Sequence, residues 1–154
     1  MLKKSAGILV YKIENNEPKV LLSHFGGPFW EGIDKGGWSI PKGELAKDEN
    51  ILDAAKREFK EETNLDLDVQ LNYLGSKKVS HRKLAIIFYA LKDFDLSKCK
   101  SNTFKLEYPS GSGKYCDFLE MDKYEWMDIS KAKEMIIANQ LYFIYKLEDI
   151  LNEY

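Results

Sequence analysis

Runs and alternations of apolar residues along the chain predict most of its β-strands. The apolar residues of 5–13 and 19–24 flank a polar turn at 14–17, and this pattern is typical of a β-hairpin inside a sheet. Further strands are predicted at residues 38–40, 66–79, 83–91 and 124–129.

Two segments carry apolar residues at the spacing of a helix. The first covers residues 50–63 without an internal proline or glycine, and Asp48 or Asn50 is suited to cap its start. The second covers residues 131–154, with Ser130 as its expected cap and a break near Asn139. Strands mixed with helices in this order predict an α/β fold, an α/β/α sandwich around a mixed β-sheet.

Two segments lack either pattern and are predicted to be loops. Residues 25–37 contain five of the ten glycines together with Pro28, and long ordered loops in domains are often functional. Residues 93–115 are predicted to be irregular, with a turn at Pro109 and the following Ser-Gly-Ser-Gly.

Size and composition narrow the class of protein. A chain of 154 residues that is 44% apolar and 13% aromatic is expected to form a single domain, residues 1–154, and not a disordered chain. Its formal net charge of −2 argues against a duplex nucleic acid as partner. The two cysteines, Cys99 and Cys116, exclude a disulfide scaffold and lack the spacing of a zinc site. The longest apolar run, 84–91, is too short to span a membrane, and we expect a cytoplasmic protein without a membrane partner.

The helix at 50–63 carries an unusual set of acidic residues. At about 100° per residue, Glu58 and Glu62 project along the same line as Ala55, and Glu61 lies beside Glu58. Lys56 and Lys60 fall on the opposite side, so they do not neutralise these carboxylates. A solvated acidic face would show acids interleaved with lysines. The observed pattern instead indicates a site for a hard cation with oxygen ligands, and Mg²⁺ fits best.

The residues around this helix resemble the signature of the Nudix hydrolase family, over residues 43–65. That signature is a glycine, a glutamate six residues later, and then R-E-U-x-E-E-x-G-U, where U is apolar. The chain has Gly43, Glu49, Arg57-Glu58-Phe59, Glu61-Glu62 and Asn64-Leu65, so Asn64 replaces the last glycine. Asparagine is the next most tolerated residue at the left-handed position that ends a helix, so the replacement is mild. Arg57 is one of only two arginines in the chain.

The resemblance implies a mechanism and a set of site residues. Members of the family use Mg²⁺, with Mn²⁺ as a possible substitute, and a water molecule to hydrolyse a nucleoside diphosphate linked to another group. By position, Glu58 and Glu62 are the main metal ligands, and Glu61 is a ligand or activates the water. The resemblance also places the carbonyl of Lys42 on the metal. It implies that Arg57 pairs with Glu49 and fixes the helix against the preceding loop.

Three further stretches, 26–30, 38–44 and 101–104, are similar to a bacterial subgroup described as predicted NTP pyrophosphohydrolases. This similarity implies a nucleoside triphosphate as substrate, an oxidised one included, giving nucleoside monophosphate and pyrophosphate. Hydrolysis of a dinucleoside polyphosphate or a nucleotide sugar is the alternative enzyme activity. The chain could also be a catalytically silent nucleotide-binding module, but the intact glutamates argue against this. The partner expected is a small nucleotide, and the chain is a monomer or a homodimer.

A few residues outside the signature are candidates for binding. Trp30 either stacks on a nucleobase or anchors the glycine-rich loop, and the sequence does not separate these roles. Lys42 and Gly43 are expected to contact substrate. Glu120 and Glu125 lie where some family members place an extra catalytic glutamate, but we expect both on the solvated surface. Trp38 is expected in the core, and His24 and His81 in structural roles.

Overall fold

The computed structural model describes residues 2–153, and its centre is a mixed β-sheet built around a long first strand. This strand, β1 (Lys3–Glu14), runs antiparallel to β2 (Glu17–Phe25) and parallel to β6 (Lys83–Leu91). The order across the sheet is β3-β2-β1-β6-β5, with β4 paired to β1 and β9 paired to β2. The remaining strands of this sheet are β3 (Trp38–Ser39), β4 (Lys42–Glu44), β5 (Asn72–Ser80) and β9 (Met121–Asp128).

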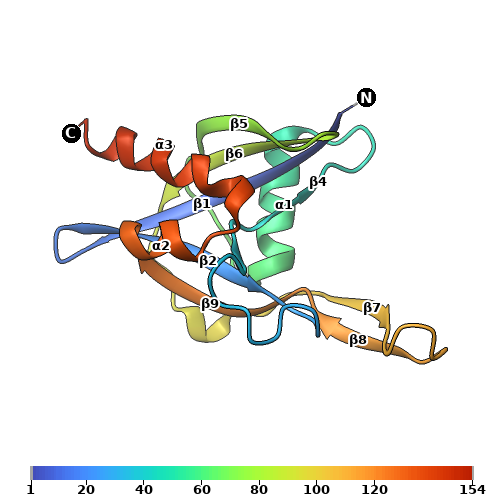
Figure 1. Cartoon of the computed structure of the whole chain (residues 1–154). Helices are drawn as coiled ribbons and strands as arrows, with labels where there is room; N and C mark the ends of the chain where they lie inside the picture. The colour runs from blue at the N-terminus through green and yellow to red at the C-terminus, as the bar shows by residue number, and fades with distance from the viewer. Residues whose placement is uncertain (1, 154) are drawn as a thin grey trace.

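Helices cover both faces of this sheet (Figure 1). Helix α1 (Ile51–Thr63) packs on one face, over a core that includes Ile8, Val10 and Phe59. Helices α2 (Ile129–Met135) and α3 (Leu141–Leu151) pack on the other, over a second core that includes Leu9 and Phe143. The predicted α/β/α sandwich around a mixed sheet is therefore confirmed. No helix within residues 2–153 is both long and apolar enough to cross a membrane.

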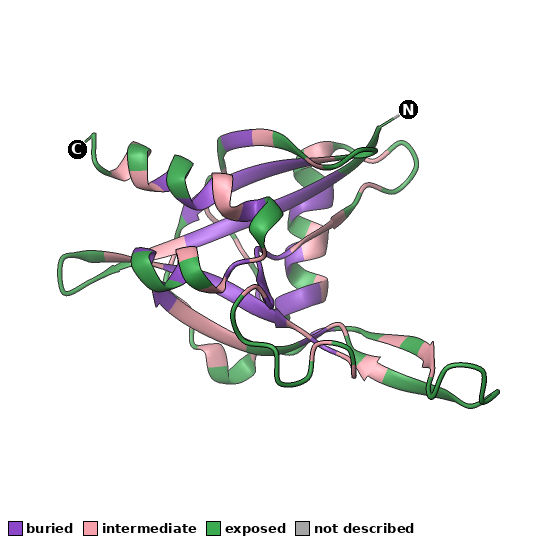
Figure 2. Ribbon diagram, in the orientation of Figure 1, coloured by how far each residue is buried: buried purple, intermediate pink, exposed green. Residues whose placement is uncertain are grey.

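The continuous apolar run of β1 follows from its central position. Successive side chains of a strand point to opposite faces, so a strand covered on both faces needs apolar residues throughout. Ile8, Leu9 and Val10 are fully buried, and they contribute alternately to the two cores. Figure 2 shows that the buried part of the ribbon follows these central strands and the inner sides of the helices.

Both ends of α1 agree with the sequence prediction. The side chain of Asn50 accepts hydrogen bonds from the backbone N–H groups of Leu52 and Asp53, so Asn50 is the cap. Asn64 ends the helix in the left-handed conformation, with φ of 64°, which explains how asparagine replaces glycine there. Phe59 is 1% exposed and packs against Phe94, with ring centroids 6.0 Å apart.

Several elements of the structure differ from the prediction. Residues 93–115, expected to be irregular, contain the short helix η1 (Leu96–Lys98) and the strand β7 (Thr103–Glu107). β7 pairs with β8 (Tyr115–Leu119) in a hairpin that projects from the body of the molecule (Figure 1). Apolar and polar residues alternate only weakly in this segment, because the hairpin has no buried face. Its strand residues are exposed or half-buried.

The other differences concern where elements begin. β5 starts at Asn72, later than expected, because Leu67, Val69 and Leu71 pack against the α1-side core without pairing in the sheet. The short strand β4 was not predicted. Helix α2 begins at Ile129, and its cap is Asp128, not Ser130, because the Asp128 carboxylate accepts the Lys131 N–H. The expected break near Asn139 is confirmed as the short helix η2 (Ala138–Gln140).

Candidate active site

The guanidinium of Arg57 ties helix α1 to the loop that precedes it. Arg57 Nε donates to Glu49 Oε2 at 2.8 Å and Nη2 donates to Glu49 Oε1 at 3.0 Å, a two-point contact. Arg57 Nη2 also donates to the carbonyl oxygen of Glu44 at 3.1 Å. These hydrogen bonds lower the pKa of Glu49 to about 2, so this carboxylate stays ionised. The contact between Arg57 and Glu49 is the one implied by the sequence.

Arg57 also contacts two of the helix glutamates, which was not expected from the sequence. Its Nη1 donates to Glu58 Oε1 at 2.8 Å and to Glu61 Oε1 at 3.0 Å. The expectation that nothing neutralises this cluster is therefore wrong for Glu58 and Glu61. The reason is that the long side chain of Arg57 reaches both the next residue, Glu58, and the residue one turn later, Glu61.

Glu62 is the buried member of the cluster, with 3% of its surface exposed. Its Oε2 accepts a hydrogen bond from the Lys42 backbone N–H at 3.2 Å. Its other oxygen, Oε1, is buried and has no hydrogen-bond partner within residues 2–153. Burial disfavours the charged form, and this raises the pKa of Glu62 well above its ordinary value.

Glu58 lies against the backbone of Gly43. A Cβ atom on residue 43 would meet the Glu58 carboxylate at 2.0 Å, so any other residue here would force this carboxylate to move. Desolvation raises the pKa of Glu58, and the contact with Arg57 works in the opposite direction. The glycine of the signature thus has a steric reason in this chain: it lets β4 and α1 approach closely.

Lys42 connects the cluster to the sheet through its backbone. Its N–H binds Glu62, while Gly7, the residue opposite it on β1, leaves space for its side chain. Burial lowers the pKa of the Lys42 ammonium, with the charge of Lys83 acting in the same direction and that of Glu62 against it. The structure therefore places Lys42 and Gly43 beside the glutamates.

Glu120, expected on the solvated surface, instead belongs to the site. It is half-buried, and desolvation followed by the charge of Glu61 raises its pKa. Its charge in turn acts on Glu58 and Glu62, so Glu120 is a fourth carboxylate of the cluster. The backbone explains its position. Glu120 N–H donates to the Asn102 carbonyl, and Asn102 N–H donates to the Glu61 carbonyl, both at 2.9 Å.

Glu125 does not belong to the cluster. It lies on β9 opposite Leu22, so it is on the face of the sheet that α2 and α3 cover. Its carboxylate pairs with the ammonium of Lys131. No signal in a single sequence separates Glu120 from Glu125, because the separation depends on how the hairpin β7–β8 is attached to α1.

The donor set of this cluster suits a hard divalent cation. It offers carboxylate oxygens from several glutamates, one of which, Glu62 Oε1, is buried without a partner among the described residues. Within residues 2–153 no three histidine, cysteine or acidic side chains are already grouped as a preformed metal centre. Glu58 and Glu61 each contact Arg57 Nη1 through Oε1, which leaves the second oxygen of each carboxylate for a cation.

Trp30 lies in the glycine-rich loop, and His24 and Trp38 flank it, whereas His81 is exposed in the turn between β5 and β6. Trp30 packs on Phe25, with ring centroids 4.6 Å apart, and its role in binding stays a prediction. Trp38 is 4% exposed and belongs to the core, as expected. His24 is buried, and its ring nitrogens contact the Asp122 carboxylate and the Ile33 carbonyl.

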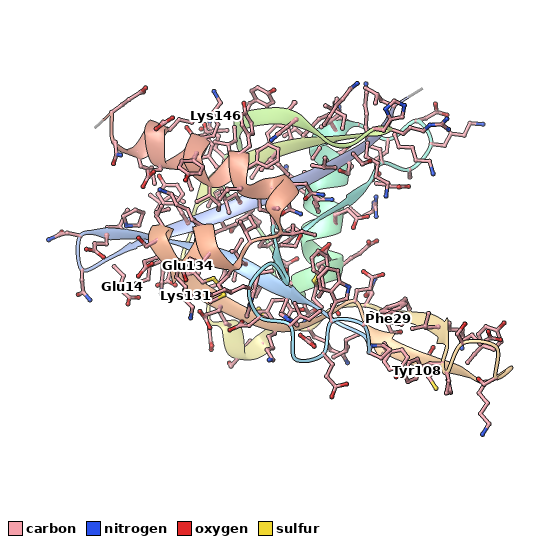
Figure 3. The ribbon with its side chains drawn as sticks, in the orientation of Figure 1. Glu14, Phe29, Tyr108, Lys131, Glu134 and Lys146 are labelled. Atoms are coloured by element: carbon pink, nitrogen blue, oxygen red, sulfur yellow. The ribbon has the colours of Figure 1, made fainter. Side chains whose placement is uncertain are left out.

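A pocket of about 510 Å³ lies between the glycine-rich loop and the hairpin β7–β8. Tyr108 lines this pocket. Phe29 packs against Tyr108 at an edge-to-face angle of 83°, with centroids 6.2 Å apart, and Figure 3 shows them side by side. Phe29 is 66% exposed, so its ring is available for a ligand. The pocket reaches Leu119, the residue before Glu120. It was not expected from the sequence because it joins two segments predicted as loops.

Comparison with known proteins places the chain in a family. The model of the NUDIX domain matches residues 1–147. The chain therefore belongs to the NUDIX family, whose members are hydrolases of acid anhydrides.

Solved structures with the same fold cover nearly the whole chain. The NUDIX domain of Shewanella oneidensis NrtR, solved with ADP ribose, has a TM-score of 0.69 at 16% identity, and the match covers 98% of this chain and 89% of that one. A Caenorhabditis elegans Ap4A hydrolase has a TM-score of 0.63 at 21% identity, and the match covers 99% and 100% of the two chains. At these identities the likeness shows the fold.

The m7GpppN-mRNA hydrolase of Saccharomyces cerevisiae is 28% identical over 120 residues. The match covers 74% of this chain and 10% of that protein. The chain thus spans about a tenth of the length of the curated relatives it matches.

Proposed function

We propose that the protein is a Mg²⁺-dependent pyrophosphohydrolase that acts on a nucleoside diphosphate linked to another group. The substrate we favour is a nucleoside triphosphate, an oxidised one included, converted to nucleoside monophosphate and pyrophosphate. The observation that carries the proposal is the group of four carboxylates, Glu58, Glu61, Glu62 and Glu120, of which Glu62 is buried with one unpartnered oxygen. Such an arrangement is costly unless a cation offsets it.

Each residue of the site has a distinct role in this proposal. Glu58 and Glu62, together with the Lys42 carbonyl, would hold Mg²⁺ or Mn²⁺, and the cation would stabilise charge on the phosphate oxygens and lower the pKa of water. Glu61, with Glu120 as the other candidate, accepts the proton of the attacking water. The water oxygen bonds to phosphorus as the bridging P–O bond breaks. Arg57, held by Glu49, keeps the ligand helix in place.

We propose that an aromatic pocket binds the nucleoside end of the substrate. The pocket that Tyr108 lines includes Leu119, the neighbour of Glu120 in the chain, and we place the base of the nucleotide there. Trp30, anchored on Phe25, supports the loop that forms one wall of this pocket, and base contact by Trp30 itself is the second possibility.

The pocket also has room for the second nucleoside of a substrate that carries two. Its volume of about 510 Å³ lies within the ~300–1,000 Å³ of typical ligand sites. A dinucleoside polyphosphate, as in the name of the Caenorhabditis elegans Ap4A hydrolase, or a capped RNA end, as in that of the yeast m7GpppN-mRNA hydrolase, would use it. A nucleotide sugar would place its sugar in the same pocket, and a catalytically silent module would bind a nucleotide there without hydrolysis.

A substrate panel with product identification tests the proposal. The purified protein with Mg²⁺ is given nucleoside triphosphates, oxidised ones included, dinucleoside polyphosphates, ADP ribose and a capped dinucleotide, and the products are separated by ion-exchange chromatography. We expect monophosphate and pyrophosphate from a triphosphate, and much lower turnover with Glu62→Gln than with the control Glu125→Gln. Binding of nucleotides without any Mg²⁺-dependent product would overturn the enzyme proposal in favour of a binding module.

A further inference from the structure

Three strands bring lysines together at the N-terminal end of β1. In the pairing of β1 with β6, Lys3 lies opposite Lys83 and Ser5 opposite Ala85. In the pairing of β1 with β4, Ser5 lies opposite Glu44 and Gly7 opposite Lys42. Residues in register point to the same face of a sheet, and so do residues two apart on one strand. Lys3, Ser5, Lys42 and Lys83 therefore share one face.

This face is the one covered by α2 and α3, and not the face that carries α1 and its glutamates. Ala85 and Ile87, which are in register with Ser5 and Gly7, belong to the core under α2 and α3. Gly43, which lies next to Lys42 on β4, points the other way and contacts Glu58. The lysines thus lie on the opposite face from the glutamates, at the end of the sheet where the start of β1, β4 and the β5–β6 turn meet (Figure 1).

A small pocket of about 60 Å³ lies among these side chains. Its volume is far below the ~300–1,000 Å³ of pockets that hold drug-sized ligands, but it exceeds what one ordered water needs. It therefore fits a small ion and excludes a nucleobase. The residues around it are Lys3, Lys4, Ser5, Lys42, Gly43, Glu44 and Lys83.

Ser5 gives this pocket a buried hydrogen-bond donor. Ser5 is 7% exposed, and its Oγ is buried without a hydrogen-bond partner in the described part of the chain. Most buried polar side chains have a partner, so an unpartnered hydroxyl at the wall of a pocket indicates a ligand that accepts a hydrogen bond.

The charges around the pocket favour an anion. Like charges directly opposite each other on neighbouring strands are unfavourable, and Lys3 and Lys83 are in this position. Glu44 is the acidic residue that lines the pocket. Its carboxylate is 4.0 Å from Lys83 Nζ, and both side chains are more than half exposed, so this pair is weak. Four lysines line the pocket against this single glutamate, so the charged side chains around the pocket are positive on balance.

We propose that this pocket binds a phosphate group, either inorganic phosphate or a phosphate of a nucleotide. The Ser5 hydroxyl donates to one oxygen of the anion, and the ammonium groups of Lys3, Lys42 and Lys83 neutralise its charge. Since the Lys42 backbone N–H holds Glu62, an anion that fixes the Lys42 side chain also steadies the strand beside the carboxylate cluster.

Phosphate binding without metal tests this site separately from catalysis. In EDTA, inorganic phosphate is titrated at constant ionic strength against chloride, with the melting temperature and ³¹P line broadening as readouts. We expect phosphate to raise the melting temperature of the parent. Ser5→Ala and Lys83→Gln should each weaken the apparent phosphate affinity about tenfold, the usual effect of one lost charge-assisted hydrogen bond. Glu44→Gln should strengthen it.

Lys78→Gln is the matched control, because Lys78 is an exposed lysine of neighbouring β5 that does not line the pocket. It should leave the phosphate response unchanged. A parent that does not respond to phosphate, or a Lys78→Gln variant that loses as much as Lys83→Gln, would overturn the proposal.

A non-hydrolysable nucleoside triphosphate, also in EDTA, distinguishes the two sources of the phosphate group. If a nucleotide phosphate occupies the pocket, Ser5→Ala and Lys83→Gln weaken the binding of this analogue as well. If free phosphate occupies it, they weaken phosphate binding alone. Either result supports the site, and neither depends on hydrolysis by the protein.

Discussion

At the scale of single residues, burial determines the properties of Glu62. Its folded-state pKa lies well above that of the unfolded chain, so the folded protein holds a proton that the unfolded chain releases. The free energy of unfolding of the metal-free protein therefore falls as the pH rises from about 4.3 through the raised pKa. Urea unfolding in EDTA at about pH 5 and pH 8 measures this, with the parent less stable at the higher pH.

Glu62→Gln should weaken that dependence, because glutamine keeps the shape without the charge. The raised pKa values of Glu58 and Glu120 leave part of it. The metal-free variant should be at least as stable as the parent at about pH 8, and its turnover should fall by on the order of 10²–10³-fold. Glu125→Gln is the control, since its carboxylate pairs with Lys131 away from the cluster. Parental turnover with Glu62→Gln together with an inactive Glu125→Gln would place the catalytic centre elsewhere.

Arg57 acts through geometry more than through charge. Lysine keeps the charge but cannot make the two-point contact with Glu49 while also reaching Glu58 and Glu61. We expect Arg57→Lys to lower kcat about 10- to 100-fold, as for residues that position metal ligands. Nucleotide binding should be largely kept, which equilibrium titration measures. A variant with parental kcat would show that the contact is dispensable.

At the scale of elements, local sequence predicts α1 well and the hairpin β7–β8 poorly. Helix α1 has one apolar face, an asparagine cap and an asparagine stop, all of which are local signals. The hairpin has no buried face, and its base is attached to α1 through Asn102 and the Glu61 carbonyl, a contact between distant segments. Glu58, Glu61, Glu62, Arg57 and Glu49 could thus be recognised from one stretch of sequence, whereas Glu120 could not.

The attachment of the hairpin to α1 makes Glu120 a test of the assembled site. If Glu120 acts with the helix glutamates, Glu120→Gln should lower turnover and raise the Mg²⁺ concentration that gives half-maximal activity. Glu125→Gln is the control, because its carboxylate pairs with Lys131 away from the cluster, and it should leave the Mg²⁺ requirement unchanged. Steady-state rates across a Mg²⁺ titration measure both. If the two variants behave alike, Glu120 takes no part in the site, as expected from the sequence.

The packing of the segment around η1 can be followed through its cysteine. Burial raises the pKa of the Cys99 thiol to about 11, so little thiolate forms near neutral pH, whereas Cys116 on β8 is exposed. A disulfide reagent at about pH 8 should modify one thiol quickly and the second only on unfolding. Cys116→Ser should remove the fast phase. A fast phase that persists in this variant would show that the segment opens readily.

At the scale of the whole molecule, the charges balance in number but not in place. The formal net charge is only −2, yet carboxylates gather at α1 and the hairpin base, while lysines gather at the end of the sheet where β1, β4 and β6 meet. These two groups are joined by β4, whose residues contribute to both. Composition alone gives no sign of this separation, because it arises from strand pairing between distant parts of the chain.

We expect the carboxylate group to make the stability of the whole fold depend on divalent cations. A cation that binds the folded protein and not the unfolded chain stabilises it by mass action, by about 2.7 kcal/mol at a concentration one hundred times the dissociation constant. We therefore expect Mg²⁺ or Mn²⁺ to raise the melting temperature above that in EDTA by several degrees, as expected for a domain of this size. Glu62→Gln should reduce this rise, because it removes the buried charge that the cation offsets. Differential scanning calorimetry at a fixed pH measures the shift, with Glu125→Gln as a variant that should respond like the parent. Equal melting temperatures in EDTA and in Mg²⁺, together with unchanged turnover, would show that no divalent cation occupies this cluster.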